Sequence, residues 1–263
     1  RRQRQMCIRD SMQADLHQRR ISADDISIGF GRIAVGLAKK IMLADRLSGI
    51  VDQFLGNDFT SQTTLGVWYG VVLYALQMYF DFSGYSDMAI GIARIFGFHL
   101  DENFRHPFLC KDITEFWQRW HISLGTFFRD YLLYVPLFGK RRKIGGLLLV
   151  WFCTGLWHGA SWNFVLWGLI FFVLLTLEKN VYGKFLERTH ILKHAYIIFI
   201  IPLTWMVFAI TDMHQLGTYF TRLFPFLTSD EVQSNTRDAV QAFHNYWKIL
   251  VPCVLFSTPL PLM

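Results

Sequence analysis

The sequence predicts an all-α, multipass integral membrane protein, and three observations support this fold class. Of its 263 residues, 52% are hydrophobic and 17% are aromatic, while only 17% are charged. The mean hydropathy is positive, at +0.27. The apolar residues also gather in long runs, and the longest, residues 144–177, contains no Asp, Glu, Lys or Arg. Soluble domains rarely combine these properties, so a membrane protein is the leading interpretation.

The charged residues and cysteines fit this interpretation. The net charge is +6, which by itself is compatible with nucleic-acid binding. The basic residues, however, stand in short clusters beside apolar runs, such as residues 39–40 and 139–143, as in the cytoplasmic loops of multipass proteins. We therefore expect membrane lipid around the protein and no nucleic-acid partner. The four cysteines lack CxxC spacing, and His190 and His194 have no third ligand nearby, so we expect no metal site.

Both ends of the sequence suggest a piece of a longer protein. The chain begins at Arg1 rather than at Met, and it stops inside another apolar segment. We expect residues 1–11 to be a non-native or disordered segment. Residues 12–263 would then be a partial membrane domain that lacks N-terminal spans and is truncated at its C-terminus.

The first half of the chain shows helix signals separated by polar stretches. Ser22 is a predicted N-cap, followed by acidic residues in the first helical turn. Residues 26–45 are apolar with three basic residues, which predicts an interfacial helix or a span with snorkelling ends. Residues 64–80 are uncharged and just long enough to cross a membrane. The polar sequence at 81–87 is expected to interrupt that helix before residues 88–98.

Residues 115–134 predict one amphipathic helix after an irregular segment, 99–114. Large apolar side chains recur there at three- and four-residue steps, and His121 stands at the edge of the face that they form. The polar side chains on this helix cannot easily face lipid, so we expect it inside a protein cavity or at the interface. The apolar face comprises Trp117, Trp120, Leu124, Phe128 and Tyr131.

The uncharged run at 144–177 is too long for one span. A single helix of that length would measure about 51 Å, against about 30 Å of hydrocarbon. Gly155 and Gly159 offer a bend, and both flanks are basic, so we expect two short spans or a re-entrant pair. Residues 195–211 predict another span, 212–247 a polar loop, and a last apolar segment begins near Ile249. We expect four to six membrane segments.

Two histidines carry the strongest chemical signal. His158 lies near the middle of the uncharged run, flanked by Trp157 and Trp162, and His121 also has tryptophan neighbours. Ionisable groups at membrane depth are costly and often functional, although a buried histidine bonded to a backbone carbonyl stays open as the alternative. An imidazole can take a proton from a hydroxyl and return it to a leaving group, which suits acyl transfer.

Other polar residues fit a structural role better than a catalytic one. Asp81 and Asp87 could serve proton transfer, but we expect their carboxylates to cap freed amides at the predicted helix break, with Ser83 as a further structural polar residue. The sequence has no HExxH metal motif, no GxSxG nucleophile motif and no phosphate-binding glycine loop.

Three blocks of sequence, at 77–98, 103–137 and 155–168, resemble the membrane-bound O-acyltransferase (MBOAT) family. The nearest branch is the bacterial alginate O-acetyltransferase (AlgI-like) type, which is related to D-alanine transfer proteins (DltB). The resemblance implies a helical bundle around a central funnel or tunnel, with His158 as the near-invariant catalytic histidine and His121 as the second active-site position. Phe138 stands where many members of that branch have glycine, which puts alginate itself in doubt as the substrate.

The resemblance also implies an activity and its partners. A membrane O-acyltransferase, multipass in a bacterial inner membrane, would move an acetyl group from a cytoplasmic thioester toward hydroxyls of an exported cell-surface polysaccharide. The donor would be acetyl-CoA or an acyl carrier protein, with no bound cofactor, and an SGNH-type protein in the periplasm or at the surface would assist. In this reading the tryptophans shape a dry channel and the arginines guide an anionic donor; the channel residues are Trp117, Arg119, Trp120, Arg129, Asp130, Trp157, Trp162 and Asn163.

Three other functions remain open. The first is transfer of D-alanine or another acyl group to a cell-wall polymer. The second is a proton-coupled transporter that uses His121, His158, Asp81 and Asp87 as its pathway, which would predict ionisable residues on several spans and often an inverted repeat. No repeat is visible here. The third is a polysaccharide-export scaffold without catalysis, which the presence of both histidines disfavours.

Overall fold

The computed structural model describes residue 16 and residues 20–56, 62–134, 143–227 and 237–259. Every regular element in these ranges is a helix, and their one extended pairing is a single bridge between Phe104 and Trp120. The all-α prediction is therefore confirmed, while the predicted segment 1–11 lies outside the described residues. The helices are α2 (Ala23–Ala38), α3 (Asp45–Leu55), α4 (Thr64–Ile95), α5 (Ile113–Arg119), α6 (Ile122–Tyr131), α7 (Lys143–His158), α8 (Trp162–Leu177), α9 (Gly183–Glu187), α10 (His190–Ala209), α11 (Met213–Leu223) and α12 (Arg237–Phe256), with π-helical turns at Lys39–Ala44 and Glu178–Tyr182 and 3₁₀ turns at Pro107–Leu109 and Pro225–Leu227.

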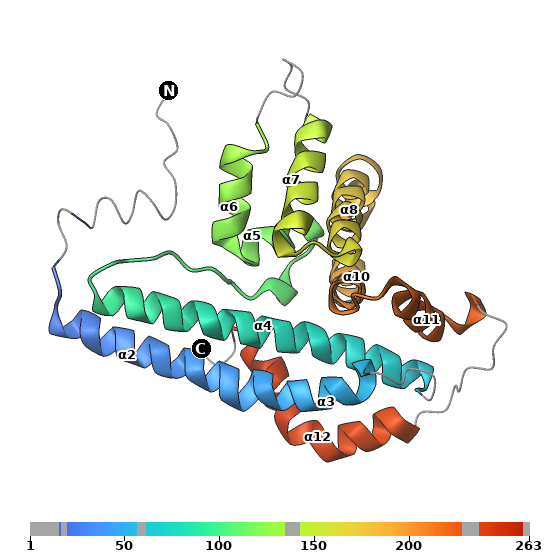
Figure 1. Cartoon of the computed structure of the whole chain (residues 1–263), viewed down its shortest axis with the longest axis horizontal. Helices are drawn as coiled ribbons and strands as arrows, with labels where there is room; N and C mark the ends of the chain where they lie inside the picture. The colour runs from blue at the N-terminus through green and yellow to red at the C-terminus, as the bar shows by residue number, and fades with distance from the viewer. Residues whose placement is uncertain (1–15, 17–19, 57–61, 135–142, 228–236, 260–263) are drawn as a thin grey trace.

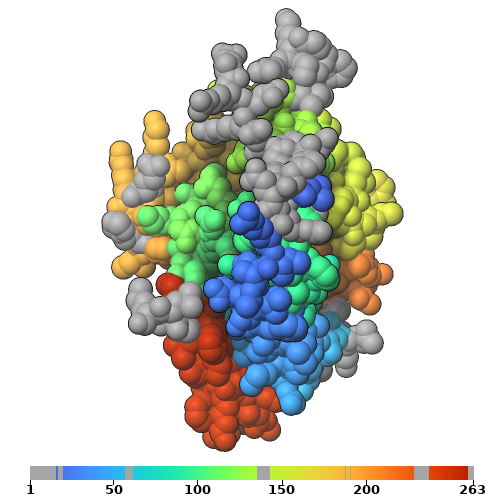
Figure 2. Space-filling view, turned by 90° about the vertical axis from the view of Figure 1, so that its left-hand side faces the viewer, coloured from blue at the N-terminus to red at the C-terminus, as the bar shows by residue number. Residues whose placement is uncertain are grey.

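The long helix α4 divides the molecule into two parts (Figure 1). Helices α2 and α3 run along one side of α4, and α12 packs beside them. Helices α5 to α8 and α10 lie on the other side of α4, where α6, α7 and α8 are steeply inclined to it. In the space-filling view, α3 (light blue) and α12 (red) lie side by side at the lower end (Figure 2). The two parts differ in composition, because charged pairs dominate the first and aromatic rings the second.

Helix α2 begins where the sequence predicts and packs tightly on α4. The Ser22 hydroxyl accepts a hydrogen bond from the amide of Asp25 at 3.0 Å, as an N-cap does. The two helices run antiparallel, and glycines let their backbones meet: a Cβ added at Gly36 would lie 2.5 Å from the carbonyl oxygen of Gly84. Residues 26–45 therefore form a helix that continues into a π-helical turn and packs along α4.

Helix α4 is continuous, so the predicted break at 81–87 is wrong. The helix runs for 32 residues, and its polar side chains bond to another element instead of capping freed amides. Asp87 Oδ2 is 2.6 Å from Lys39 Nζ, and Asp81 Oδ1 is 2.6 Å from Lys40 Nζ. Cations on the π-helical turn thus neutralise carboxylates that would otherwise disfavour an apolar helix. Tertiary pairing here overrides the weak helix propensity of Asp, Ser and Gly.

The bend predicted inside the uncharged run is confirmed. Helix α7 ends at His158 and α8 begins at Trp162, and the two helices pack against each other. Gly155 permits this close approach, since a Cβ there would lie 2.5 Å from the carbonyl oxygen of Phe164. The result is a helical hairpin in which the predicted catalytic histidine is the last helical residue before the turn.

The C-terminal third contains more helix than predicted. Helix α10 covers most of the expected span at 195–211, is long and apolar enough to cross a membrane, and tolerates Pro202 in its interior. The predicted polar loop at 212–247 is wrong, because it contains α11 and the start of α12. Asp212 caps α11 by accepting from the amide of Gln215 at 2.9 Å. Helix α11 is amphipathic, with apolar side chains on one face only, so the polar average composition of the segment hid the helix from the sequence analysis. The buried residues of this face are Leu216, Tyr219 and Leu223.

Two stretches of the described chain are helical, long and apolar enough to cross a membrane. They are Trp162–Leu186 and Ile191–Ala209. The larger expectation, four to six segments in a multipass arrangement around a funnel, stays a prediction.

A buried carboxylate fixes α5 against the end of α8. Glu178 Oε2 accepts from the amide of Ile113 at 2.8 Å, and its Oε1 accepts from the amide of Thr114 at 3.1 Å. These bonds occupy the free amides that open a helix. They hold α5, and the residues that follow it, in one place relative to the α7–α8 hairpin.

Candidate functional site

His121 lies at the junction of α5 and α6, so the single helix predicted over 115–134 is wrong. Its backbone has φ 46° and ψ 54°, a left-handed conformation that non-glycine residues rarely adopt. The chain before the junction is extended and pairs with the irregular segment upstream: the amide of Arg105 donates to the carbonyl of Arg119 at 2.9 Å, and the amide of Ile122 donates to the carbonyl of Asn103 at 3.0 Å. This pairing replaces the helical bonds that would have continued α5.

The imidazole of His121 is held by polar groups on one edge and by aromatic rings. Its Nδ1 lies 3.2 Å from Asn103 Oδ1 and 3.4 Å from Ser123 Oγ. The ring of Phe82, on α4, meets it edge-on with centroids 4.6 Å apart. His121 stands outside the two candidate spans, and burial lowers its pKa to about 4, with a smaller contribution from nearby His158. A neutral imidazole is therefore expected at neutral pH.

His158 is the last residue of α7 and lies among aromatic rings. Its ring centroid is 4.9 Å from that of Trp157, 5.2 Å from that of Trp167 and 5.0 Å from that of Phe208. Across the parts of the chain that the structure describes, its side chain has no hydrogen bond to the protein. The structural alternative considered from the sequence, a histidine bonded to a backbone carbonyl, is thus wrong for the described residues. An imidazole positioned by packing alone keeps both nitrogens available.

The structure brings the two predicted catalytic histidines to one site. Trp157 contacts both, with its ring centroid 6.1 Å from that of His121 and 4.9 Å from that of His158. This tryptophan is 57% exposed, so the pair lies beside an accessible surface rather than deep in the core. Trp157 is thus the ring that the two imidazoles share.

The other predicted tryptophans have different surroundings. Trp120 is buried and stacks on Phe116 with centroids 5.6 Å apart. Trp117 packs against rings of the α7–α8 hairpin, including Trp151 at 4.8 Å. Both belong to the aromatic core that supports the site. Trp162 is 76% exposed at the start of α8, and its predicted place in a channel stays a prediction.

The predicted polar channel residues bond locally or within the core. Asn163 is buried and donates to the carbonyl of Phe208 at 3.0 Å, which joins α8 to α10. Arg119 forms an ion pair with Glu115 one turn earlier, and Arg129 Nε lies 2.9 Å from Asp130 Oδ1. The roles of these arginines in guiding a donor stay predictions.

None of the three polar residues predicted on α4 is among the described residues that contact either histidine ring. Asp81 and Asp87 pair with cations of α2 and its π-helical turn. Ser83 is buried, and its hydroxyl has no hydrogen-bond partner within the described residues. A structural role for the two aspartates is supported, although through ion pairs rather than amide capping.

Sequence reasoning missed three residues that surround His121. Asn103 and Ser123 contact its Nδ1, and Phe82 packs against its ring. Asn103 comes from a segment without helical or strand periodicity, so no pattern in the sequence marked it as a neighbour of His121. Ser123 lies two residues after His121, but its role depends on a backbone turn that the predicted continuous helix concealed.

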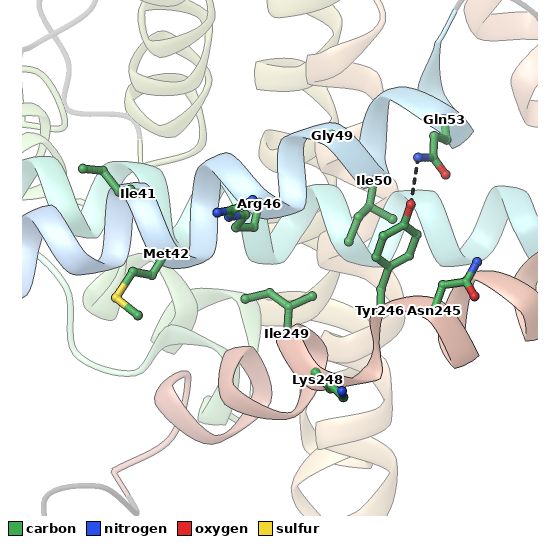
Figure 3. A pocket seen from close by; sticks show the side chains of 10 residues that line it. All are labelled: Ile41, Met42, Arg46, Gly49, Ile50, Gln53, Asn245, Tyr246, Lys248 and Ile249. Carbon is green, nitrogen blue, oxygen red and sulfur yellow. Dashed lines mark hydrogen bonds between the residues drawn. The ribbon is translucent and has the colours of Figure 1, made fainter.

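An open pocket lies elsewhere, between α3 and α12 (Figure 3). It has a volume of about 600 Å³, and the hydrogen bond from Gln53 to Tyr246 crosses one end of it. None of the predicted catalytic or channel residues lines it. Within the described ranges, no group of three or more His, Cys, Asp or Glu residues is arranged to hold a metal ion.

Comparison with known proteins identifies relatives for most of the chain. The model of the MBOAT, membrane-bound O-acyltransferase family, matches residues 4–221. A Pseudomonas fluorescens protein named "Probable alginate O-acetylase AlgI" is 37% identical over 208 residues, which are 77% of this chain and 41% of that protein. The peptidoglycan O-acetyltransferase of Helicobacter pylori is 38% identical over 169 residues, 63% of this chain and 32% of that protein.

A third relative is named for the transfer of a different group, D-alanine. The teichoic acid D-alanyltransferase of Bacillus subtilis is 31% identical over 166 residues, which cover 59% of this chain and 41% of that protein. The chain thus spans less than half the length of these curated relatives.

Proposed function

We propose that this chain, which belongs to the membrane-bound O-acyltransferase family, is part of an enzyme that transfers an acetyl group to hydroxyls of an exported cell-surface polysaccharide. The family assignment and the names of the relatives support acyl transfer as the reaction class. The single observation that carries the proposal is the meeting of His121 and His158 on Trp157. Two imidazoles at one accessible point can supply the proton transfers that acyl transfer needs.

The proposed reaction moves one acyl group and one proton. An acceptor hydroxyl attacks the carbonyl carbon of a thioester, and His158 accepts the hydroxyl proton. The C–O bond forms as the C–S bond breaks, and the proton passes from His158 to the departing thiolate. His121 could either polarise the thioester carbonyl or orient a reactant, and the hydrogen bonds of its ring support orientation. The aromatic rings around His158 limit water, which would otherwise hydrolyse the thioester.

The remaining details of the proposal follow the family. The donor is acetyl-CoA or an acyl carrier protein thioester on the cytoplasmic side of a bacterial inner membrane. The acceptor lies on the other side, with an SGNH-type partner protein assisting or relaying the acetyl group. Transfer of D-alanine to a teichoic acid is the second candidate, and the Bacillus subtilis relative is the observation that favours it. The aspartates that a proton pathway would need are paired with cations, which disfavours the transporter alternative.

The test uses the full-length protein in cells that lack their own copy. We expect His158→Ala to lower glycan-bound acetate at least 100-fold, because the attacking hydroxyl loses its base. His214→Ala is the matched control, since His214 is an exposed histidine on α11. Immunoblots of membrane fractions would check equal protein levels.

The outcomes of these assays test the proposed base and identify the acyl donor. Acetate that persists in His158→Ala at normal protein levels would overturn the proposed base. Labelled acetyl-CoA, acetyl carrier protein and D-alanyl carrier protein, supplied to membranes in parallel, would identify the donor. Incorporation from the D-alanyl carrier alone would replace the acetyl proposal with the second candidate.

A further inference from the structure

We propose that Asn103 is a positioning residue that fixes His121 in the tautomer with hydrogen on Nδ1, so that Nε2 presents a lone pair to the reactants. The role of Nε2 toward the reactants rests on the proposed function. The assignment of the tautomer rests on hydrogen bonds alone. It also decides between the two roles offered for His121. A neutral imidazole with a bare Nε2 accepts a hydrogen bond there and cannot donate one to a thioester carbonyl.

The first step is the orientation of the Asn103 amide, because oxygen and nitrogen of an amide are otherwise interchangeable. The backbone amide of Ser123 points at Oδ1 from 3.1 Å. A backbone N–H is always a donor, so the atom that it meets must be the oxygen. On the other side, Nδ2 donates to Ser86 Oγ on α4 at 3.1 Å. Both sides of the amide therefore agree on one orientation.

The second step is the tautomer of His121. Its Nδ1 lies 3.2 Å from Asn103 Oδ1, which can only accept, so a hydrogen bond between these two atoms requires the hydrogen on Nδ1. The other neighbour of Nδ1 leads to the same assignment. The Ser123 hydroxyl uses its single hydrogen on Asn103 Oδ1 at 2.9 Å, which leaves it only as an acceptor toward Nδ1 at 3.4 Å. In a neutral ring, hydrogen on Nδ1 leaves Nε2 without one.

The third step is the cost of the arrangement. His121 sits in a left-handed conformation, which costs a non-glycine residue about 1–2 kcal/mol. The backbone carbonyl of Asn103 accepts from the amide of Ile122 at 3.0 Å, and its side chain binds Ser123. One asparagine thus clamps the residues on the C-terminal side of the strained position by both main chain and side chain. Strain that is stabilised so specifically is typical of functional sites.

The direct test is the tautomer itself, measured without activity. Full-length protein labelled with ¹⁵N-histidine, in detergent or lipid discs at pH 7, would be compared with His121→Gln to assign the signal. We expect the shift of a protonated nitrogen at Nδ1 and that of an unprotonated nitrogen at Nε2. The opposite pattern would overturn the proposal. This result is independent of which reaction the enzyme performs, so a failure of the proposed function would not be mistaken for a failure here.

The kinetic test separates positioning from mere support of the fold. Asn103→Asp keeps an acceptor for Nδ1–H but adds a negative charge, which stabilises the imidazolium and raises the pKa of His121. Since the reactive form is neutral, the acid limb of the profile of kcat/KM against pH should move upward by about 1–3 units. Asn103→Ala should lower kcat per folded molecule at least tenfold with little change in KM for the acyl donor. Asn180→Asp, the same substitution at an exposed position of the π-helical turn after α8, is the control and should leave the profile unchanged.

Folded protein would be counted in each sample by size-exclusion chromatography. A purely structural asparagine would reduce the amount of folded protein but leave kcat per folded molecule and the pH profile as in the wild type. That outcome would overturn the proposal.

Discussion

The α2–α4 seam and the histidine site are built on opposite principles. At the seam, backbones touch through glycines, and charged groups are paired: Asp87 Oδ1 lies 2.6 Å from Arg32 Nη2, and its Oδ2 lies 2.6 Å from Lys39 Nζ. At the histidine site, His158 is surrounded by rings and has no protein hydrogen bond within the described ranges, while Trp157 is largely exposed.

This difference indicates that the α2–α4 seam supports the fold, while the histidine site carries the reactive groups. Pairing at the seam leaves little capacity for chemistry, since a carboxylate held by two cations does not readily exchange protons. At the histidine site, one edge of His121 is bonded to Asn103 and Ser123, while the nitrogens of His158 have no protein partner within the described residues. Substitutions at the seam should therefore affect mainly the stability of the fold, and substitutions at the site mainly turnover.

The largest expected loss of stability is at the closest backbone approach. A Cβ at Gly36 would meet the carbonyl oxygen of Gly84 at 2.5 Å and Met88 Cγ at 2.8 Å. Gly36→Val should therefore cost about 3 kcal/mol and lower the Tm of the detergent-solubilised protein by roughly 10 °C. Gly31→Ala on the same helix has open space around it and should be neutral or slightly stabilising. An unchanged Tm for Gly36→Val would show that the helices are not in contact there.

A smaller loss is expected from the carboxylate at the centre of the seam. Asp87→Asn leaves Arg32 and Lys39 without their shared anion, and we expect a cost of about 2 kcal/mol, below the usual range for fully buried pairs because the two cations are 31% and 24% exposed. Asp45→Asn is the control, since the Asp45–Lys40 pair is about half exposed and should contribute less than about 1 kcal/mol. Thermal unfolding of both variants would measure the difference. Equal losses would contradict the distinction between the two pairs.

The smallest effect on stability, with a large effect on turnover, is expected at Trp157. Trp157→Ala removes the ring that contacts both histidines, yet its exposure implies a cost below about 1 kcal/mol. We expect at least a tenfold loss of acyl transfer at an unchanged Tm. Trp247→Ala, an exposed tryptophan on α12, should change neither property. A drop in Tm comparable to that of Gly36→Val would show that the site is also part of the scaffold.

Local signals in the sequence predicted the elements that depend on local forces. The Ser22 cap, the glycine bend between α7 and α8 and the proline-containing α10 all follow from residues within a few positions of each feature. The candidate catalytic pair, His121 and His158, came mainly from the resemblance to a family. The structure adds that Trp157 contacts both rings.

The features that the sequence could not predict depend on distant partners. The continuity of α4 through Asp87 requires cations that lie 55 and 48 residues earlier in the chain. The break before His121 requires pairing with the segment around Asn103. In each case, local propensity favoured one backbone and tertiary hydrogen bonds stabilised another. Helix α11 was missed for a different reason, because its apolar stripe is narrow and its average composition is polar.

The Glu178 cap on α5 has a consequence for the order of assembly during synthesis. The carboxylate that closes the first turn of α5 lies 65 residues later in the sequence than the amide of Ile113 that it binds. On a ribosome that adds about 5–20 residues per second, several seconds separate the emergence of these two groups. Until all of α8 has been made, the first turn of α5 has only its local cap, Asp112, which accepts from the amide of Glu115. His121 is therefore translated before the hairpin that contains His158, and the Glu178 contacts that fix α5 against the end of α8 form only after that hairpin is made.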